Sequence, residues 1–139
     1  MSADQNLALV HRLFDEVNNK HNLAVADQLI APDYVLHDPG NPNFSGGREG
    51  YKQFQTTFTQ AFPDHQLTFD AQFAAGELVV TRWTSTGTQT GALLGVPATG
   101  KHVKVSGITI SRIANGMVAE DWQEWDQLGL LRQLGVIPG

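Results

Sequence analysis

The stretch DWQEWD, residues 121–126, combines acidic and aromatic side chains closely enough to suggest proton-transfer chemistry. It holds three acidic residues and two of the chain's 3 tryptophans. A carboxylate surrounded by large apolar side chains has a raised pKa, which makes it a better general base near neutral pH. The alternative is a strand edge whose carboxylates are simply solvated. The choice depends on the elements that position these side chains.

The composition is typical of a globular protein with one hydrophobic core. The chain has 139 residues, of which 41% are hydrophobic and 17% charged, so we expect a single domain over residues 1–139. The net charge is -5, and the 9 Lys and Arg residues are scattered. We therefore expect no nucleic acid or anionic membrane as the main partner. The absence of cysteine excludes disulfides, thiolate catalysis and cysteine-ligated metals.

Targeting and membrane signals are also missing from the sequence. The first residues contain no basic start followed by an apolar run, and no apolar stretch approaches the ~20 residues of a membrane span. We expect a cytoplasmic protein.

The first half of the chain is predicted to be mainly helical. Apolar residues recur at helical spacing over residues 4–19 and 48–61. A short helix over residues 23–30 is expected to stop before Pro32. Residues 33–38 are predicted to form a short strand.

The second half changes to an alternating pattern with a period of two. It predicts strands near residues 65–75, 77–90, 101–113 and 117–126, then a helix over 128–134. Helices first and strands later indicate an α+β fold, with three N-terminal helices packed in a curved antiparallel sheet.

Turn chemistry predicts which side chains face inward. A turn at Ala75 and Gly76 would place Arg82 on the strongly apolar side of its hairpin. A buried guanidinium is costly without a partner, and Glu120 and Asp126 are candidate partners. A single bulge would invert this assignment.

The last hairpin is expected to turn at Asn115 and Gly116, since both residues tolerate positive φ. Counting outward from that turn places Glu120, Trp122 and Asp126 on one side of the sheet. That side is predicted to face the core if Arg82 is paired there.

Three segments resemble the SnoaL-like polyketide cyclases, members of the nuclear-transport-factor-2-like superfamily. They are AFPDHQLTF (residues 61–69), VVTRWTSTGTQTGALLGVPATGKHVKVSG (79–107) and RIANGMVAEDWQEWDQLGLLRQLG (112–135). The opening, LVHRLFDEVNNKHNLAVADQLIAPDYVLHDP, is similar to the first helices and strand of that superfamily.

The resemblance implies a cone-shaped α+β barrel with a deep pocket, and a homodimer. It also implies that a pocket aspartate on the last strand is the general acid and base of an intramolecular aldol condensation, with no metal or cofactor. Asp126 matches that motif position. Phe14 and Gln89 occupy positions where relatives often carry tyrosine and histidine.

The other candidate site residues are those expected to line the pocket that the resemblance implies. Arg82 and His37 could polarise a carbonyl or hold an enolate. Trp122, Phe14 and Phe54 could stack on a flat, apolar or aromatic substrate. Glu120 and Gln89 would complete the binding set. The loop GALLGVPATG, residues 91–100, is expected to act as a lid.

Each assignment has a structural alternative. Asp126 could cap the terminal helix, Glu120 could be solvated, Arg82 could extend outward from an edge, and His37 could hydrogen-bond to Asp38.

The fold leaves three functions open. They are a polyketide or ester cyclase, a non-catalytic module that binds a small molecule, and another acid/base enzyme such as an isomerase or epoxide hydrolase. The isomerase or hydrolase would need a second carboxylate or a tyrosine, such as Tyr34 or Tyr51. A buried pocket carboxylate would favour an enzyme.

Overall fold

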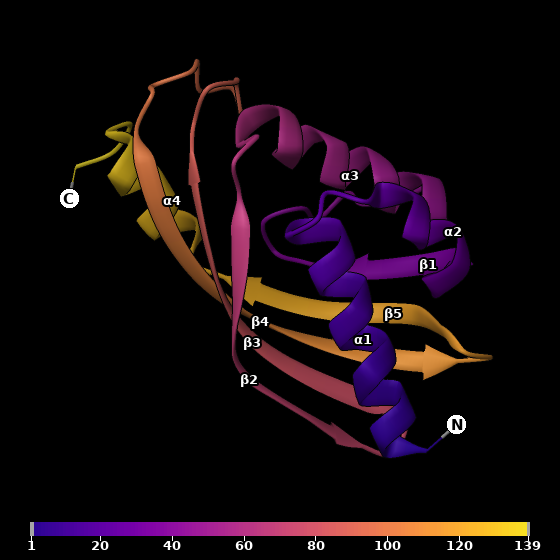
Figure 1. Cartoon of the computed structure of the whole chain (residues 1–139). Helices are drawn as coiled ribbons and strands as arrows, with labels where there is room; N and C mark the ends of the chain where they lie inside the picture. Colours follow the sequence, from indigo (N-terminus) through magenta and orange to yellow (C-terminus); the bar gives the residue numbers. More distant parts are fainter. Residues whose placement is uncertain (1, 139) are drawn as a thin grey trace.

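The computed structural model describes residues 2–138 and has its two longest helices on the concave side of a strongly curved sheet (Figure 1). The helices are α1 (Ala3–Asn18), η1 (Leu23–Val25), α2 (Ala26–Leu29), α3 (Gly47–Ala61) and α4 (Gln127–Leu134). The strands are β1 (Ile30–His37), β2 (Gln66–Ala75), β3 (Leu78–Thr88), β4 (His102–Ala114) and β5 (Met117–Trp125). The predicted α+β class is therefore confirmed, with most boundaries within a few residues of the expectation.

The five strands form one mixed sheet in the order β1-β5-β4-β3-β2. The β5, β4, β3 and β2 neighbours are antiparallel, but β1 runs parallel to β5. The prediction of a wholly antiparallel sheet is wrong at this edge, and over the described residues the sheet stays open between β1 and β2. Pro32 is tolerated inside β1 because an edge strand does not need every backbone N–H for pairing.

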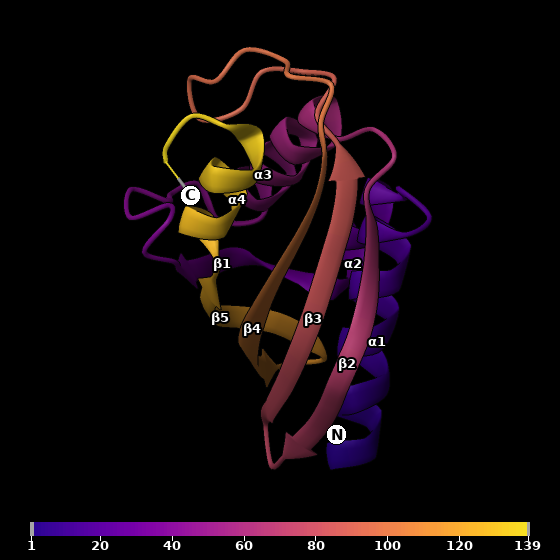
Figure 2. The same ribbon diagram turned by 90° about the vertical axis from the view of Figure 1, so that its left-hand side faces the viewer.

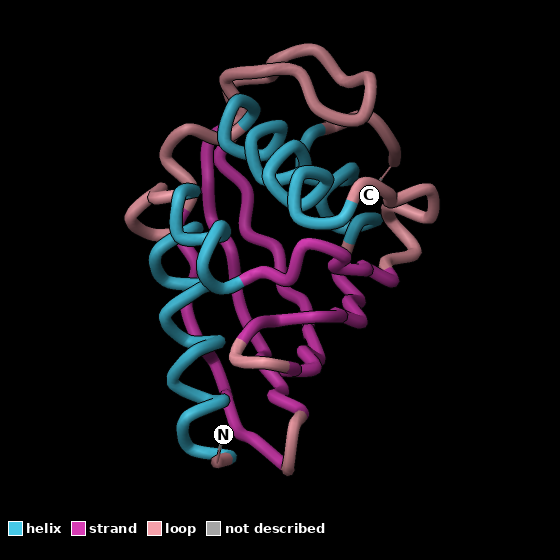
Figure 3. The backbone as a smooth tube through the Cα atoms, turned by 90° about the vertical axis from the view of Figure 1, so that its right-hand side faces the viewer, coloured by secondary structure: helices cyan, strands magenta, loops and turns pink. Residues whose placement is uncertain are grey.

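Two helices cover the inner face of the sheet. α1 packs on β2 and β3, whereas α3 packs on β1, and Figure 3 shows the two helices on the same side of the strands. A capping box begins α1, because the Ser2 hydroxyl accepts from the Gln5 amide and the Gln5 side chain accepts from the Ser2 amide. The side-chain amide of Asn6 then donates from Nδ2 to the Gly76 carbonyl oxygen at 3.1 Å, which fixes the start of α1 against the β2–β3 turn.

The apolar core fills the space between α1, α2 and the sheet. Val10, Leu13, Ile30, Val79 and Val118 are fully buried there. A second cluster lies under the loop that joins β3 to β4, the long upper loop in Figure 2. Its members are Ala61, Phe62, Leu93, Val96, Val103, Val105, Leu130 and Leu134. In the described part of the chain, no helix is long and apolar enough to cross a membrane.

The β4–β5 hairpin turns where the sequence predicts, but its register differs. Asn115 and Gly116 have φ values of 54° and 72°, as that turn requires. Ile113 pairs with Val118, whereas Arg112 pairs with Glu120. Ala119 is therefore an extra residue, a β-bulge, and every side chain after it changes faces relative to the prediction.

The β2–β3 hairpin is also shifted relative to the prediction. Ala75 pairs with Leu78, so the turn consists of Gly76 and Glu77 and not of Ala75 and Gly76. The shift keeps Phe73, Val80 and Arg82 on one side of the sheet, but that side is the outer face, where Arg82 and Phe73 are exposed. A second irregularity lies between Phe69 and Ala71, so Phe69 pairs with the buried Trp83 and not with Arg82.

Candidate functional site

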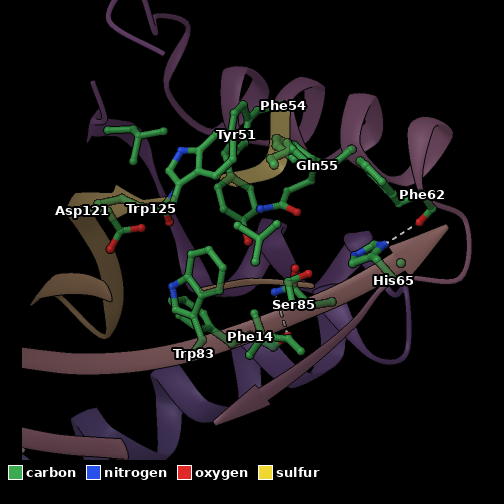
Figure 4. Close-up of a pocket in the computed structure, with 18 of the residues that line it drawn as sticks. Phe14, Tyr51, Phe54, Gln55, Phe62, His65, Trp83, Ser85, Asp121 and Trp125 are labelled. Atoms are coloured by element: carbon green, nitrogen blue, oxygen red, sulfur yellow. Dashed lines mark hydrogen bonds between the residues drawn. The ribbon is translucent and has the colours of Figure 1, made fainter. Parts of the chain in front are cut away.

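A cavity of about 120 Å³ lies between α1, α3 and the concave face of the sheet. Figure 4 shows aromatic side chains from all of these elements around it. Its wall is mainly apolar and includes Phe14, Leu36, Phe44, Phe54, Phe58, Phe62, Leu67, Trp83, Val103, Val105, Trp125 and Leu130. Its polar residues are Asn18, Tyr34, Tyr51, Gln55, His65, Ser85, Thr86, Asp121 and Gln123. An apolar enclosure with a few polar groups is the usual form of a small-molecule site.

Asp121 of β5 is the acidic residue of this wall. It is 4% exposed, and its Oδ2 accepts a hydrogen bond of 2.6 Å from the Tyr34 hydroxyl. Its Oδ1 has no hydrogen-bond partner among residues 2–138. The Ser111 hydroxyl lies beside the carboxyl and is itself without a well-formed hydrogen bond in the described chain. Tyr34 therefore holds one oxygen of Asp121, and the other oxygen is buried without a well-formed hydrogen bond in the described chain.

Burial raises the pKa of Asp121 to about 6, because the charged form loses its hydration. The polar contacts with Ser111 and Tyr34 act in the opposite direction, and the negative charge of Glu120 adds to the increase. The carboxyl is thus a stronger base than an exposed aspartate but remains mainly ionised at neutral pH.

Two tyrosines accompany the carboxyl. Burial raises the pKa of Tyr34, and the charge of Asp121 adds to this effect. The same two causes raise the pKa of Tyr51, so both phenols stay protonated at neutral pH. The rings of Tyr34 and Tyr51 meet edge to face at 5.5 Å between centroids. Both hydroxyls can therefore serve as neutral hydrogen-bond donors near Asp121.

A chain of hydrogen bonds orients the aromatic wall. The Trp83 indole donates to Thr109 Oγ1 at 3.0 Å, and Thr109 donates to Gln123 Oε1 at 2.9 Å. Gln123 Nε2 then donates to the buried carboxylate of Asp38 at 3.1 Å.

Asp38 also fixes the second wall tryptophan. Its two oxygens lie 3.2 and 3.1 Å from the Trp125 indole nitrogen. Trp83 itself is accommodated by Gly107, because a Cβ there would lie 2.4 Å from the indole ring. The two tryptophans that border the cavity are thus held in defined positions.

Of the residues predicted for the site, Phe14 and Phe54 line the cavity. Gln89 does not, although it is fully buried. Its amide binds Val96 and Thr99, so it anchors the β3–β4 loop. The loop contributes no residue to the cavity lining described here. The expected binding role of Gln89 is not supported by its position.

Asp126 lies outside the cavity lining, and the prediction that it points into the pocket is wrong. It is exposed, and its carboxylate accepts a hydrogen bond of 2.8 Å from the Gly129 amide. It is the N-cap of α4, which confirms the structural alternative. The strand ends at Trp125, so Asp126 belongs to the helix start.

His37, Glu120 and Trp122 meet on the outer face of the sheet, and their predicted inward orientation is wrong. Glu120 binds His37 at 2.6 Å and Arg112 at 3.1 Å, and these contacts hold its carboxyl pKa below the ordinary value. The His37 ring stacks on Trp122 at 5.4 Å. His37 thus pairs with Glu120 and not with Asp38, and Arg82 also lies on the outer face.

The sequence reasoning missed Asp121 and Trp83 because both were assigned to the outer side of their hairpins. The sequence offers one signal for Asp121: polar and apolar residues mix on both sides of the last hairpin, so neither side is purely apolar. That ambiguity is what a bulge produces. Within residues 2–138, no group of three or more His, Asp or Glu side chains is arranged to hold a metal ion.

The sequence and the fold of this chain are both similar to those of known proteins. Residues 8–134 match the sequence profile of the family described as SnoaL-like polyketide cyclase. TsrD from Streptomyces laurentii is 32% identical, with a TM-score of 0.88 and coverage of 99% of both chains. A candidate polyketide cyclase from Acidithiobacillus ferrooxidans is 35% identical, with a TM-score of 0.84 and coverage of 98% of this chain and 99% of that chain.

IdmH from Streptomyces antibioticus, also described as a candidate polyketide cyclase, is 31% identical, with a TM-score of 0.81. The match covers 94% of this chain and 99% of that chain. A comparison with curated proteins finds no match. The resemblance and the fold expected from the sequence are both confirmed by these relatives.

Proposed function

Since the chain belongs to the SnoaL-like polyketide cyclase family, we propose that it closes a ring of a polyketide or related ester by an intramolecular aldol reaction. In this proposal Asp121 is the general base and then the general acid. The observation that carries it is the buried carboxyl on the cavity wall, with Tyr34 bound to one oxygen and the other oxygen without a hydrogen-bond partner among residues 2–138.

The reaction moves one proton from carbon to oxygen. The Asp121 carboxylate removes a proton from a carbon activated by neighbouring carbonyls, and the resulting enolate carbon attacks a carbonyl carbon of the same molecule. A C–C bond forms, and the carbonyl oxygen becomes an alkoxide. Asp121 then returns the proton to that oxygen, so atoms and electrons balance. A positioned proton-transfer group of this kind contributes roughly 10²- to 10⁴-fold to the rate.

The residues around Asp121 would assist this step. The Tyr51 hydroxyl lies on the same wall and stays protonated, so it would donate to the oxygen on which negative charge develops. Tyr34 would hold the carboxyl in one orientation. The aromatic wall formed by Phe14, Trp83 and Trp125 would bind a flat substrate.

The size of the cavity favours a compact substrate. Its volume of about 120 Å³ is below the ≈ 300–1,000 Å³ of sites for drug-sized ligands. A single substituted ring matches this space, whereas a larger polycycle would have to displace side chains such as Phe54 and Phe58, which meet at the wall. The homodimer and the cytoplasmic location stay predictions from the resemblance and the composition.

Deuterium exchange tests the proton-transfer step without knowledge of the natural substrate. Methyl acetoacetate, a small β-keto ester with an activated methylene, would be incubated in D₂O with the protein and followed by proton NMR. The native chain should accelerate exchange, and Asp121→Asn should lose roughly 10²-fold or more of that acceleration. Asp126→Asn is the matched control, because it changes an acid of the same segment that lies outside the cavity.

Equal exchange by the native chain and Asp121→Asn would reject Asp121 as the base. Binding of the ester without any acceleration would favour the non-catalytic binding module.

A further inference from the structure

The cavity has a second buried polar group, His65, which the proposed proton transfer does not use. His65 follows α3, is 6% exposed and lines the cavity. Figure 4 shows its ring on the opposite side of the cavity from Asp121. Its Nε2 is buried and has no hydrogen-bond partner among residues 2–138.

The other ring nitrogen of His65 defines where the proton lies. Nδ1 is 3.0 Å from the backbone carbonyl oxygen of Phe62, and a carbonyl oxygen can only accept a hydrogen bond. Nδ1 must therefore carry a proton. Burial lowers the pKa of His65, and the neighbouring His21 adds to that effect, so the ring is neutral at neutral pH. Nε2 is then a hydrogen-bond acceptor with a free lone pair.

The ring is also fixed from behind. His21 stacks on it at 4.4 Å, with the planes 14° apart, and His21 Nε2 lies 2.9 Å from the His65 carbonyl oxygen. Gly87 leaves room for Phe62, whose carbonyl oxygen accepts from His65, because a Cβ at Gly87 would come within 3.1 Å of the Phe62 Cβ. The acceptor is therefore held at one place on the wall.

A buried acceptor without a partner reduces stability, and a ligand in the cavity can supply the missing donor. We infer that His65 Nε2 accepts a hydrogen bond from a hydroxyl group of the ligand. The substrate class would then carry a phenolic or enolic hydroxyl at the end remote from the carbon that Asp121 deprotonates. This inference rests on the proposed function only in taking the cavity ligand to be the substrate.

Phenol and toluene test the subsite, because they have nearly the same shape and differ in a hydroxyl and a methyl group. Dissociation constants for both would be measured by NMR titration of the native chain and of His65→Phe. The preference for phenol over toluene should fall by roughly threefold to tenfold in His65→Phe, the range for one hydrogen bond. His65→Gln, which keeps an acceptor oxygen, should retain part of the preference. His102→Gln is the control, since His102 is exposed at the start of β4.

A direct readout does not require any variant. With ¹⁵N-histidine labelling, the Nε2 resonance of His65 should shift when phenol binds and should not shift comparably with toluene. An equal phenol preference in the native chain and His65→Phe, or equal Nε2 shifts with both ligands, would overturn the inference. If His65→Phe fails to fold, the resonance shifts of the native chain still decide.

The subsite and the proposed function can fail separately. Loss of methylene exchange with an intact phenol preference would reject the catalytic role of Asp121 and keep the His65 subsite. Normal methylene exchange, together with a phenol preference that does not depend on His65, would keep the catalytic role of Asp121 and reject the His65 subsite.

Discussion

The Tyr34 hydroxyl donates to Asp121 Oδ2 at 2.6 Å and joins the parallel strands β1 and β5 inside the cavity wall. Both residues are nearly inaccessible to solvent, so the bond forms where electrostatic interactions are strong. The pair depends on the parallel pairing at this edge of the sheet, because its register places Leu36 beside Asp121 and so brings Tyr34 close to the carboxyl. The mixed topology thus has a direct consequence for the site.

Replacement of Tyr34 by phenylalanine should raise the pKa of Asp121 above its value of about 6. The Tyr34 hydrogen bond favours the charged carboxyl, and a hydrogen bond to a charged group contributes about 1.5–3 kcal/mol. An increase of roughly one to two pKa units is therefore expected. A carboxyl ¹³C NMR titration would measure it. At neutral pH the variant should also exchange the β-keto ester more slowly and recover at higher pH. An unchanged or lower pKa would contradict the assigned contact.

Asp121→Asn should change the pH dependence of stability in a defined direction. The folded pKa of about 6 exceeds the unfolded value of about 3.9. Between these values the folded chain keeps a proton that the unfolded chain has lost. The contribution of Asp121 to the free energy of unfolding therefore falls as pH rises from about 4 to about 6, by up to about 3 kcal/mol.

Urea unfolding at pH 4 and pH 7.5 measures this effect. The asparagine variant should gain stability relative to the native chain at the higher pH. If the free energies of unfolding of the variant and the native chain differed by the same amount at both pH values, the pKa of Asp121 would not be raised in the folded protein.

Asp38→Asn should disturb the cavity wall. Asp38 accepts hydrogen bonds from Trp125, Gln123 and the Gly40 amide, and an asparagine would replace one acceptor oxygen with a donor. A loss of roughly 1–3 kcal/mol in the free energy of unfolding is expected. Phenol and toluene should both bind more weakly, because the tryptophan orientation affects either ligand. Asp33→Asn, at an exposed position of β1, is the control. An effect on phenol alone would place Asp38 in direct contact with the ligand hydroxyl.

Most elements of this fold could be predicted from sequence because hydrophobic periodicity reports burial directly. Periodicity locates the helices over residues 4–19 and 48–61. The turn at Asn115 and Gly116 is found differently, because both residues tolerate positive φ. The pocket acid could not be, because one extra residue in β5 moves Glu120 outward and Asp121 inward. A bulge of this kind depends on pairing with β4, and no local pattern in the last strand specifies it.

The parallel pairing of β1 was missed for a similar physical reason. The partner of a strand from the first half of the chain depends on long-range contacts. In contrast, the hairpins are defined by neighbouring residues and short turns. The aromatic residues Phe14 and Phe54 were found because their helical faces are amphipathic and fixed by a 3.6-residue period.

Asp126→Ala should reduce stability and leave the site intact. As the N-cap of α4, Asp126 accepts from the Gly129 amide, and loss of such a cap costs about 0.5–2 kcal/mol. The free energy of unfolding should fall by that amount, whereas exchange of methyl acetoacetate by the folded protein should stay near the native rate. Asp126→Asn should restore most of the stability, because asparagine is also a favoured cap. Urea unfolding and deuterium exchange on the same samples separate the two effects. If Asp126→Ala abolished exchange in a folded protein, the proton-transfer role would move from Asp121 to Asp126, against the cavity geometry.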